Sequence, residues 1–145
     1  MAEINSLADI IRVHGVDRAE HPALIQDGRT LSWAVFAARS AQVAQGLAAD
    51  GVGGQDRVAF IDKNSIEHFE VFYGAALLNA VCVDVNWRLA APEVEYILND
   101  SDAKILVIGP VSSRSSMRFA TTSPTTTSSV CCHWRRTSGS CRATA

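Results

Sequence analysis

The spacing of apolar residues predicts alternating strands and helices in the middle of the chain. Residues 57–61, 80–85 and 104–108 are short apolar runs with the length and β-branched content of buried strands. Between them, residues 66–78 and a segment that begins at Pro92 carry apolar side chains at helical spacing. This alternation predicts an α/β fold, a layered parallel sheet with helices on both faces and right-handed crossovers.

The first third of the chain predicts a helix, a hairpin and a second helix. Residues 4–16 carry apolar side chains close to a helical period. Asp27 and Gly28 separate two short apolar runs, and they predict a hairpin turn because glycine adopts positive φ without strain. Ser32 is a good N-cap for the next helix, which we expect to end near Gly51.

The chain changes in composition after Gly109. Residues 1–109 hold 8 Lys+Arg and all 15 Asp+Glu, a net charge of −7, whereas residues 110–145 hold 5 Arg and no acid, a net charge of +5. Of these last 36 residues, 16 are Ser or Thr, and they show neither helical nor strand periodicity. The sequence therefore predicts two units, an α/β subdomain over 1–109 and a disordered tail over 110–145. Our hypothesis is that the tail is read out of frame.

Composition also restricts the partners and the compartment. The acidic body argues against general affinity for nucleic acid. The longest apolar runs are far shorter than the roughly 20 residues that span a bilayer, and the first residues lack the basic region of a signal peptide. Cys82 is the only cysteine before residue 110, which suits a reducing compartment. We expect a cytoplasmic protein without a transmembrane segment.

Several motifs are better explained by structure than by chemistry. The glycines of residues 51–54 follow a helix and precede a strand, the reverse of a phosphate-binding fingerprint, so they predict a helix stop. Three histidines near helix ends are expected on the surface: His14, His21 and His68. Four tail residues have metal-ligating side chains, but adjacent cysteines chelate poorly, so no metal site is predicted there: Cys131, Cys132, His133 and Cys141.

Asn86, Trp87 and Arg88 are the candidate site residues, because they follow the predicted strand 80–85 and precede a helix. Ligands of parallel sheets gather at the carboxyl ends of strands. An arginine there can bind a phosphate, and a tryptophan can stack on a base. In the alternative interpretation, Trp87 packs against the core and Arg88 pairs with a carboxylate. Residue chemistry leaves both open.

A series of motifs resembles the N-terminal portion of the AMP-forming acyl-CoA synthetase (adenylate-forming ligase) family, with its fatty-acyl-CoA ligase branch nearest. The resemblance covers about residues 4–109, and it rests on these segments in order: 31–36, 55–59, 64–65, 74–76 and 85–93. Two residues depart from the family pattern. Asn79 stands where glycine is usual, and Asp84 stands where proline is usual. A carboxylate inside a strand is unfavourable unless it is paired.

The resemblance implies a two-step reaction of fatty-acid metabolism. ATP adenylates a carboxylate, and the CoA thiol then displaces AMP, with ATP, Mg²⁺ and CoA as cofactors of the full-length enzymes. The family's phosphate loop, Mg²⁺-binding glutamate and catalytic lysine lie beyond the matched region. We therefore expect no catalytic residue in this chain and no tight binding of these cofactors. Arg88 matches a loop arginine that approaches the CoA nucleotide phosphate in some relatives, and Trp87 is a weaker candidate beside it.

Two functions remain open at this point. The chain is either a truncated, inactive acyl-CoA ligase or a non-catalytic α/β module that associates with a separately translated remainder. We also expect self-association, because the helix 66–78 is apolar on more than one face and the strand 105–108 would leave an open sheet edge.

Overall fold

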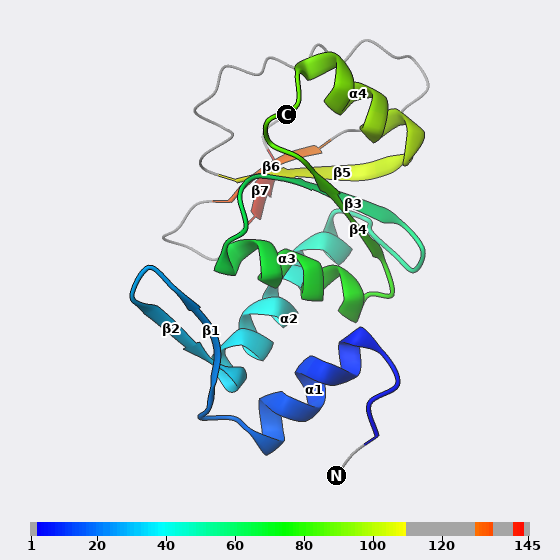
Figure 1. Cartoon of the computed structure of the whole chain (residues 1–145). Helices are drawn as coiled ribbons and strands as arrows, with labels where there is room; N and C mark the ends of the chain where they lie inside the picture. Colours follow the sequence, from blue (N-terminus) through cyan, green and yellow to red (C-terminus); the bar gives the residue numbers. More distant parts are fainter. Residues whose placement is uncertain (1–2, 110–129, 135–140, 144–145) are drawn as a thin grey trace.

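The computed structural model describes residues 3–109, 130–134 and 141–143, and Figure 1 shows their arrangement. The chain begins with a helix, a two-stranded hairpin and a long second helix, and strands then alternate with helices. In chain order the elements are α1 (Leu7–Asp17), β1 (Pro22–Gln26), β2 (Arg29–Ser32), α2 (Trp33–Ala49), β3 (Arg57–Ile61), α3 (Ile66–Leu77), β4 (Val81–Val85), α4 (Ala91–Asp100), β5 (Ala103–Ile108), β6 (Val130–Trp134) and β7 (Cys141–Ala143).

The main sheet has the strand order β4-β3-β5-β6-β7, and all of its neighbouring pairs are parallel except β6 with β7. The chain passes from β3 through α3 to β4 on one side, and then through α4 to β5 on the other side of β3. Crossovers of one handedness therefore place α3 and α4 on opposite faces. Figure 1 shows α4 above the sheet and α2 and α3 below it. The predicted α/β fold with helices on both faces is confirmed.

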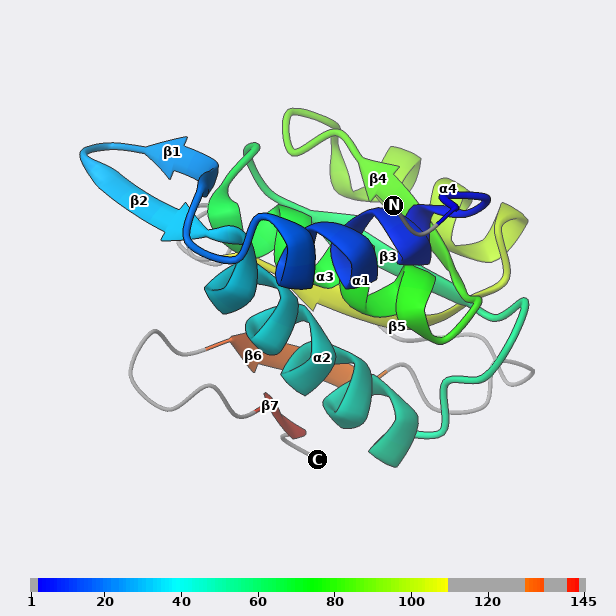
Figure 2. The same cartoon turned by 90° about the horizontal axis from the view of Figure 1, so that it is seen from below.

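β3 lies between two hydrophobic clusters. Val58 and Phe60 point into a core that α2 and α3 cover, while Ala59 and Ile61 point into a core that α4 covers. All four side chains are buried. α1 packs against α2 and α3, as the view from below shows (Figure 2). The strand that both cores share is thus the centre of the fold.

The predicted helices are present, although α1 begins three residues later than residue 4 and α2 ends at Ala49, two residues before Gly51. The hydroxyls of Ser32 and Ser65 accept hydrogen bonds from the N–H groups of Val35 (3.4 Å) and His68 (3.1 Å), as N-caps do. α4 begins one residue earlier than Pro92, and the Glu93 carboxylate accepts a hydrogen bond from the N–H of Ala90 at 2.8 Å. The N-terminal caps of these helices can therefore be predicted from the residues immediately around each helix start.

Left-handed backbone occurs where the turns require it. Gly28 has φ +74° in the β1–β2 turn, and Gly51 has φ +87° after α2, at the predicted helix stop. Asn79 has φ +57° between α3 and β4. Asparagine tolerates this region better than most residues with a side chain, which explains how it stands at a position where the resembling family uses glycine.

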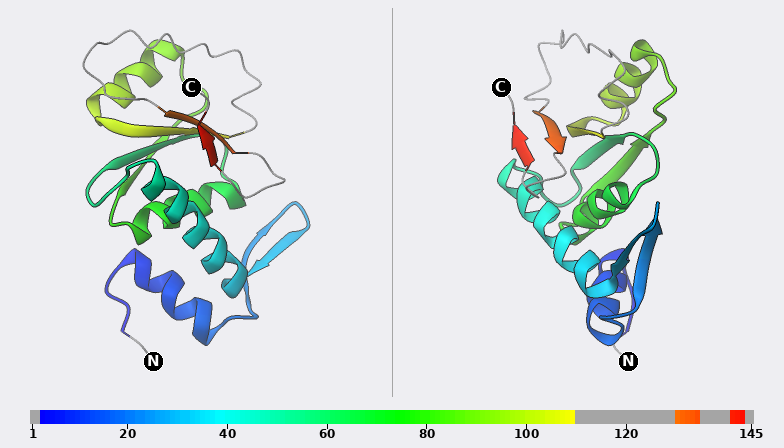
Figure 3. Two further views of the ribbon diagram at one scale, coloured as in Figure 1. Left: turned by 180° about the vertical axis from the view of Figure 1, so that it is seen from behind. Right: turned by 90° about the vertical axis from the view of Figure 1, so that its left-hand side faces the viewer.

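The expected open edge at residues 105–108 is wrong. β5 pairs in parallel with β6, from Ile105 opposite Val130 to Ile108 opposite His133, and Figure 3 shows β6 and β7 continuing the sheet beyond β5. The remainder of the predicted disordered tail, residues 110–129, 135–140 and 144–145, lies outside the described residues. In the described part of the chain, no helix is both long and apolar enough to cross a membrane.

α2 and α3 approach closely because Gly74 has no side chain. A Cβ at Gly74 would lie 2.7 Å from Cγ1 of Val43 and 3.2 Å from the carbonyl oxygen of Ser40. Both neighbours belong to the buried face of α2. The glycine therefore sets the spacing of the two helices that cover this face of the sheet.

We expect Gly74→Ala to lower the free energy of unfolding, measured by chemical denaturation. Alanine favours a helix by roughly 1 kcal/mol over glycine, but forcing a methyl group into packed helices opposes this by about 1–3 kcal/mol. In a Val43→Ala background Cγ1 of Val43 is gone, whereas the Cβ of residue 43 at 3.0 Å and the carbonyl oxygen of Ser40 at 3.2 Å remain, so the same substitution should destabilise less. Gly53→Ala is the matched control, because its Cβ would meet only Asp56 Oδ2 at 3.7 Å. An equal or larger loss of stability from Gly74→Ala in the Val43→Ala background would contradict this account.

Candidate functional site

The candidate site lies where β3 and β4 end. Ile61 pairs with Val85 in parallel register, so the segments 62–64 and 86–88 leave the sheet side by side. Together with the adjoining strand and helix residues they line a cavity of about 630 Å³. Its lining consists of Phe60, Asp62, Lys63, Asn64, His68, Asp84, Val85, Asn86, Trp87 and Arg88. The cavity thus has the location expected for a ligand of a parallel sheet.

Two cations lie against the Trp87 ring. The guanidinium carbon of Arg88 is 4.4 Å from the ring centroid, and Nζ of Lys63 is 4.8 Å from it. At these distances a cation is attracted by the negative face of the indole. Trp87 also packs against the hydrophobic cluster under α4. Asn86 stabilises the turn, since its Oδ1 accepts a hydrogen bond from the N–H of Arg88 at 3.0 Å.

The structure thus combines parts of both interpretations of this loop. Trp87 packs, as the alternative interpretation had it. Arg88 lines the cavity and stacks on Trp87, and within the described residues no ion pair joins it to a carboxylate. Lys63 was not among the candidates, although it also follows the carboxyl end of a strand. Arg88 was selected because ligands gather at the carboxyl ends of parallel strands, and the same reasoning would have selected Lys63.

His68 is not the surface histidine that we expected. Its side chain is 12% exposed, its ring stacks on Phe60 with centroids 4.5 Å apart, and its Nε2 lies 2.7 Å from Oδ1 of Asp84. α3 turns this residue toward β4. The Asp84 side chain is 56% exposed, so solvent as well as His68 offsets the cost of a carboxylate inside the strand. His14 is also partly buried, against Trp33, whereas His21 is exposed as expected.

Cys82, which packs against the hydrophobic cluster under α2 and α3, is unreactive. Its thiol lies 3.6 Å from Oδ1 of Asp84, and burial together with that carboxylate raises the pKa of Cys82 to about 12. The nucleophilic thiolate is therefore absent at neutral pH. Among the residues that the structure describes, no group of three His, Cys, Asp or Glu side chains is arranged to hold a metal ion.

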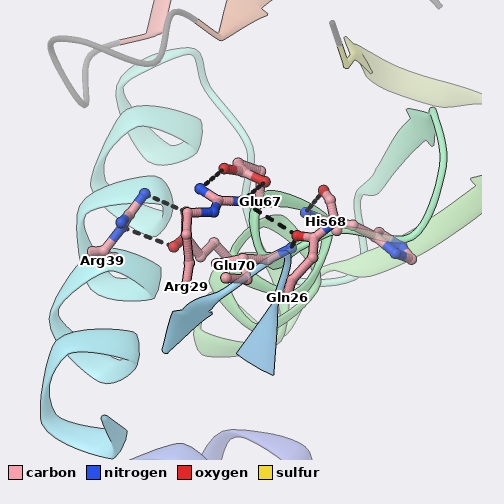
Figure 4. A network of polar contacts seen from close by, with 8 residues as sticks. Gln26, Arg29, Arg39, Glu67, His68 and Glu70 are labelled. Atoms are coloured by element: carbon pink, nitrogen blue, oxygen red, sulfur yellow. Dashed lines mark hydrogen bonds and ion pairs between the residues drawn. The ribbon is translucent and has the colours of Figure 1, made fainter. Parts of the chain in front are cut away.

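A second polar cluster holds the hairpin and α2 against α3 (Figure 4). Arg29 Nη1 lies 2.9 Å from Glu67 Oε1, and Gln26 accepts a hydrogen bond from the N–H of Ile66 at 2.9 Å. Arg39 Nε lies 2.7 Å from Oε1 of Glu70, which is fully buried. Burial raises the pKa of Glu70 to about 7, while Arg39 opposes the rise. This cluster positions α3, whose first turn borders the cavity.

Sequence comparison relates the chain to AMP-binding enzymes. The profile of the AMP-binding enzyme family matches residues 12–139. The fatty acid–[acyl-carrier-protein] ligase ScoC of Streptomyces coeruleorubidus is 36% identical over 113 residues, 75% of this chain and 22% of that protein. The long-chain-fatty-acid–CoA ligase FadD13 of Mycobacterium tuberculosis is 46% identical over 79 residues, 54% of this chain and 16% of that protein.

Structural comparison gives the same result. A fatty acyl CoA synthetase of Mycobacterium tuberculosis superposes with a TM-score of 0.78 at 33% identity, over 86% of this chain and 26% of that one. The N-terminal domain of FACL13 from the same organism superposes with a TM-score of 0.73 at 34% identity, over 77% of this chain and 29% of that one. The chain thus spans less than a third of the length of the relatives it matches.

The raised pKa of Glu70 predicts a pH-dependent stability. In the unfolded chain this carboxyl titrates near its ordinary value of 4.5, and in the fold it titrates near 7. Between these values the folded state binds more protons than the unfolded state, so the free energy of unfolding falls as the pH rises. The full change amounts to about 3 kcal/mol at most. Above pH 7 and below pH 4.5, Glu70 contributes no further change.

We expect Glu70→Gln to remove this dependence, because glutamine stays neutral at every pH. The melting temperature of the variant minus that of the wild type should increase between about pH 4.5 and 7 and then stay constant. Glu95→Gln, which removes an exposed glutamate of α4, is the control. Parallel pH profiles for the wild type and Glu70→Gln would show that the buried carboxyl does not titrate in this range.

Proposed function

The chain belongs to the AMP-binding enzyme family, and on that premise we propose that it is the N-terminal part of a fatty-acyl-CoA ligase. The whole enzyme would adenylate a fatty acid with ATP and Mg²⁺ and then form a thioester with CoA. The observation that carries the proposal is the 46% identity to a long-chain-fatty-acid–CoA ligase. The cavity at the carboxyl ends of β3 and β4 supports it, since it offers a place for part of a nucleotide.

Within this function, Arg88 is the residue that we assign to the CoA nucleotide phosphate. It lies at the cavity, its guanidinium is always charged, and a planar fork of donors suits phosphate oxygens. Trp87 packs against the hydrophobic cluster under α4, and its ring holds the guanidinium of Arg88 in place. ATP and Mg²⁺ would be bound by parts of the full-length family enzymes that lie outside the region this chain matches. We place the enzyme in the cytoplasm and in fatty-acid metabolism.

Under this proposal, the chain by itself does not catalyse the adenylation of a fatty acid. Its only lysines are Lys63 and Lys104, and neither follows a run of Gly, Ser and Thr as a phosphate-loop lysine does. Lys104 Nζ lies 2.9 Å from Oδ2 of Asp56, ahead of β3 and away from the cavity. Substrate, ATP and CoA would therefore bind weakly to the chain alone.

We expect the purified chain to show no carboxylate-dependent exchange between ATP and pyrophosphate, because the groups that hold the reacting phosphates are missing. The assay uses a panel of fatty acids, with a buffer blank and a full-length fatty-acyl-CoA ligase as negative and positive controls. Exchange above the blank that depends on the added carboxylate would contradict the proposal.

A second candidate is a non-catalytic module that assembles with a separately translated remainder. The chain spans 16% of FadD13 and 22% of ScoC, so ligase activity of such an assembly would depend on the partner segment. Co-expression with the segment encoded downstream distinguishes the two candidates. A stable complex with ligase activity supports the module, whereas a chain that stays separate and inactive supports the first proposal.

A further inference from the structure

We propose that the free edge of β4 is a docking surface for a second copy of this chain, in which the two β4 strands pair antiparallel about a two-fold axis at Val83. The inference concerns the edge of the sheet and not the assignment of Arg88, so the two can fail separately. It also gives the expected self-association a different origin, because β6 covers the edge at residues 105–108.

β4 is the outermost strand of the main sheet. The strand order is β4-β3-β5-β6-β7, and among the described residues no strand pairs with the outer side of β4. The side view of Figure 3 shows the sheet running from β4 at one edge to β7 at the other. Val81 is 46% exposed and the side chain of Asp84 is 56% exposed, so this edge reaches solvent. Unpaired backbone groups at such an edge are a template for another strand.

The backbone groups on the open side belong to Cys82 and Asp84. The N–H of Val81 donates a hydrogen bond to the carbonyl oxygen of Asp56 at 2.8 Å, and the whole strand pairs one to one with β3. Successive residues of a strand in a sheet direct their backbone groups to opposite neighbours. The odd-numbered residues of β4 therefore bond to β3, and the N–H and C=O groups of the two even-numbered residues point away from it.

The strand is complementary to itself in one register. With Val83 on the two-fold axis, Cys82 of one copy lies opposite Asp84 of the other, and every residue of β4 has a partner. Both of these residues present backbone groups on the open side, so each opposed pair can exchange two N–H···O bonds. A register that places Asp84 opposite its own counterpart would bring two carboxylates to roughly 5 Å, which is destabilising.

Charge therefore restricts what the edge can accept. A charged side chain on an edge strand disfavours most pairings. In the register centred on Val83 the two Asp84 side chains are diagonal neighbours at roughly 7–8 Å, and each has Nε2 of His68 at 2.7 Å from its Oδ1. The formal net charge of the chain is −2, so two copies repel each other only weakly as they approach. These conditions favour a second copy as the occupant.

The first test is disulfide cross-linking of the complete 145-residue chain in a background in which its four cysteines are replaced by serine. The two copies of Val83→Cys would face each other at the axis with Cα atoms roughly 4.5 Å apart, within the range of a disulfide. Val81→Cys is the matched control. Its two copies would lie roughly 14 Å apart along the strand, although Val81 is the more exposed residue.

We expect Val83→Cys to form a disulfide-linked dimer when diamide is added as the oxidant, and Val81→Cys to remain monomeric under the same conditions. Cross-linking of Val81→Cys to the same extent as Val83→Cys would show random collision or another register, and it would overturn the proposal.

The second test leaves the native cysteines in place and measures the mass of the chain by sedimentation equilibrium in reducing buffer. Asp84→Pro removes the outward N–H, whereas Asp84→Asn keeps it, and both remove the carboxylate. Proline is tolerated on edge strands. The mass of the wild type should rise with concentration toward twice that of the monomer. Asp84→Asn should dimerise at least as well, and Asp84→Pro should weaken the dimer by roughly tenfold or more.

Three results of the sedimentation experiment would contradict the proposal. A wild type that stays monomeric at every concentration would overturn it. Equal dimerisation of Asp84→Pro and Asp84→Asn would show that the contact lies elsewhere on the chain. A chain that is monomeric alone and pairs through β4 with the segment encoded downstream would replace the second copy by that segment.

Discussion

The burial of β3 on both faces is the constraint on which the rest of the structure depends. Ala59 faces one hydrophobic cluster and Phe60 faces the other, and β4 and β5 flank the strand on its two edges. A strand buried on every side must be short, apolar and parallel to neighbours that return through helices. Within β3 only Arg57, at its amino end, is not buried, so the polar side chains lie at the ends of this strand and in the loops that follow them.

This constraint also explains why the cavity contains the residues it does. Parallel pairing in register brings the carboxyl ends of β3 and β4 to one level, and the segments that follow meet there. α3 begins directly after the first of these segments and turns His68 toward Asp84. The arrangement of Lys63, Trp87 and Arg88 is therefore a consequence of sheet register more than of any local motif.

Local patterns were sufficient to predict the elements, and the ends of most of them to within a few residues. The Asp27–Gly28 turn, the serine caps and the three apolar strands all depend on neighbouring residues only, and each is found in the structure. The loop at Arg88 was predicted as a binding site because it follows the carboxyl end of a strand. Contacts between distant segments were not predictable in this way. The pairing of His68 with Asp84 depends on how α3 rotates over β4, and the pairing of β5 with β6 joins residues separated by more than twenty positions.

The most direct test of the account is a crystal structure of this chain with CoA bound. The account places the ribose phosphate of CoA at the carboxyl ends of β3 and β4, within hydrogen-bond distance of Arg88. It also requires the Arg88 guanidinium to remain against the Trp87 ring. A CoA phosphate bound elsewhere, for example at the amino ends of the strands beside Lys104, would contradict it.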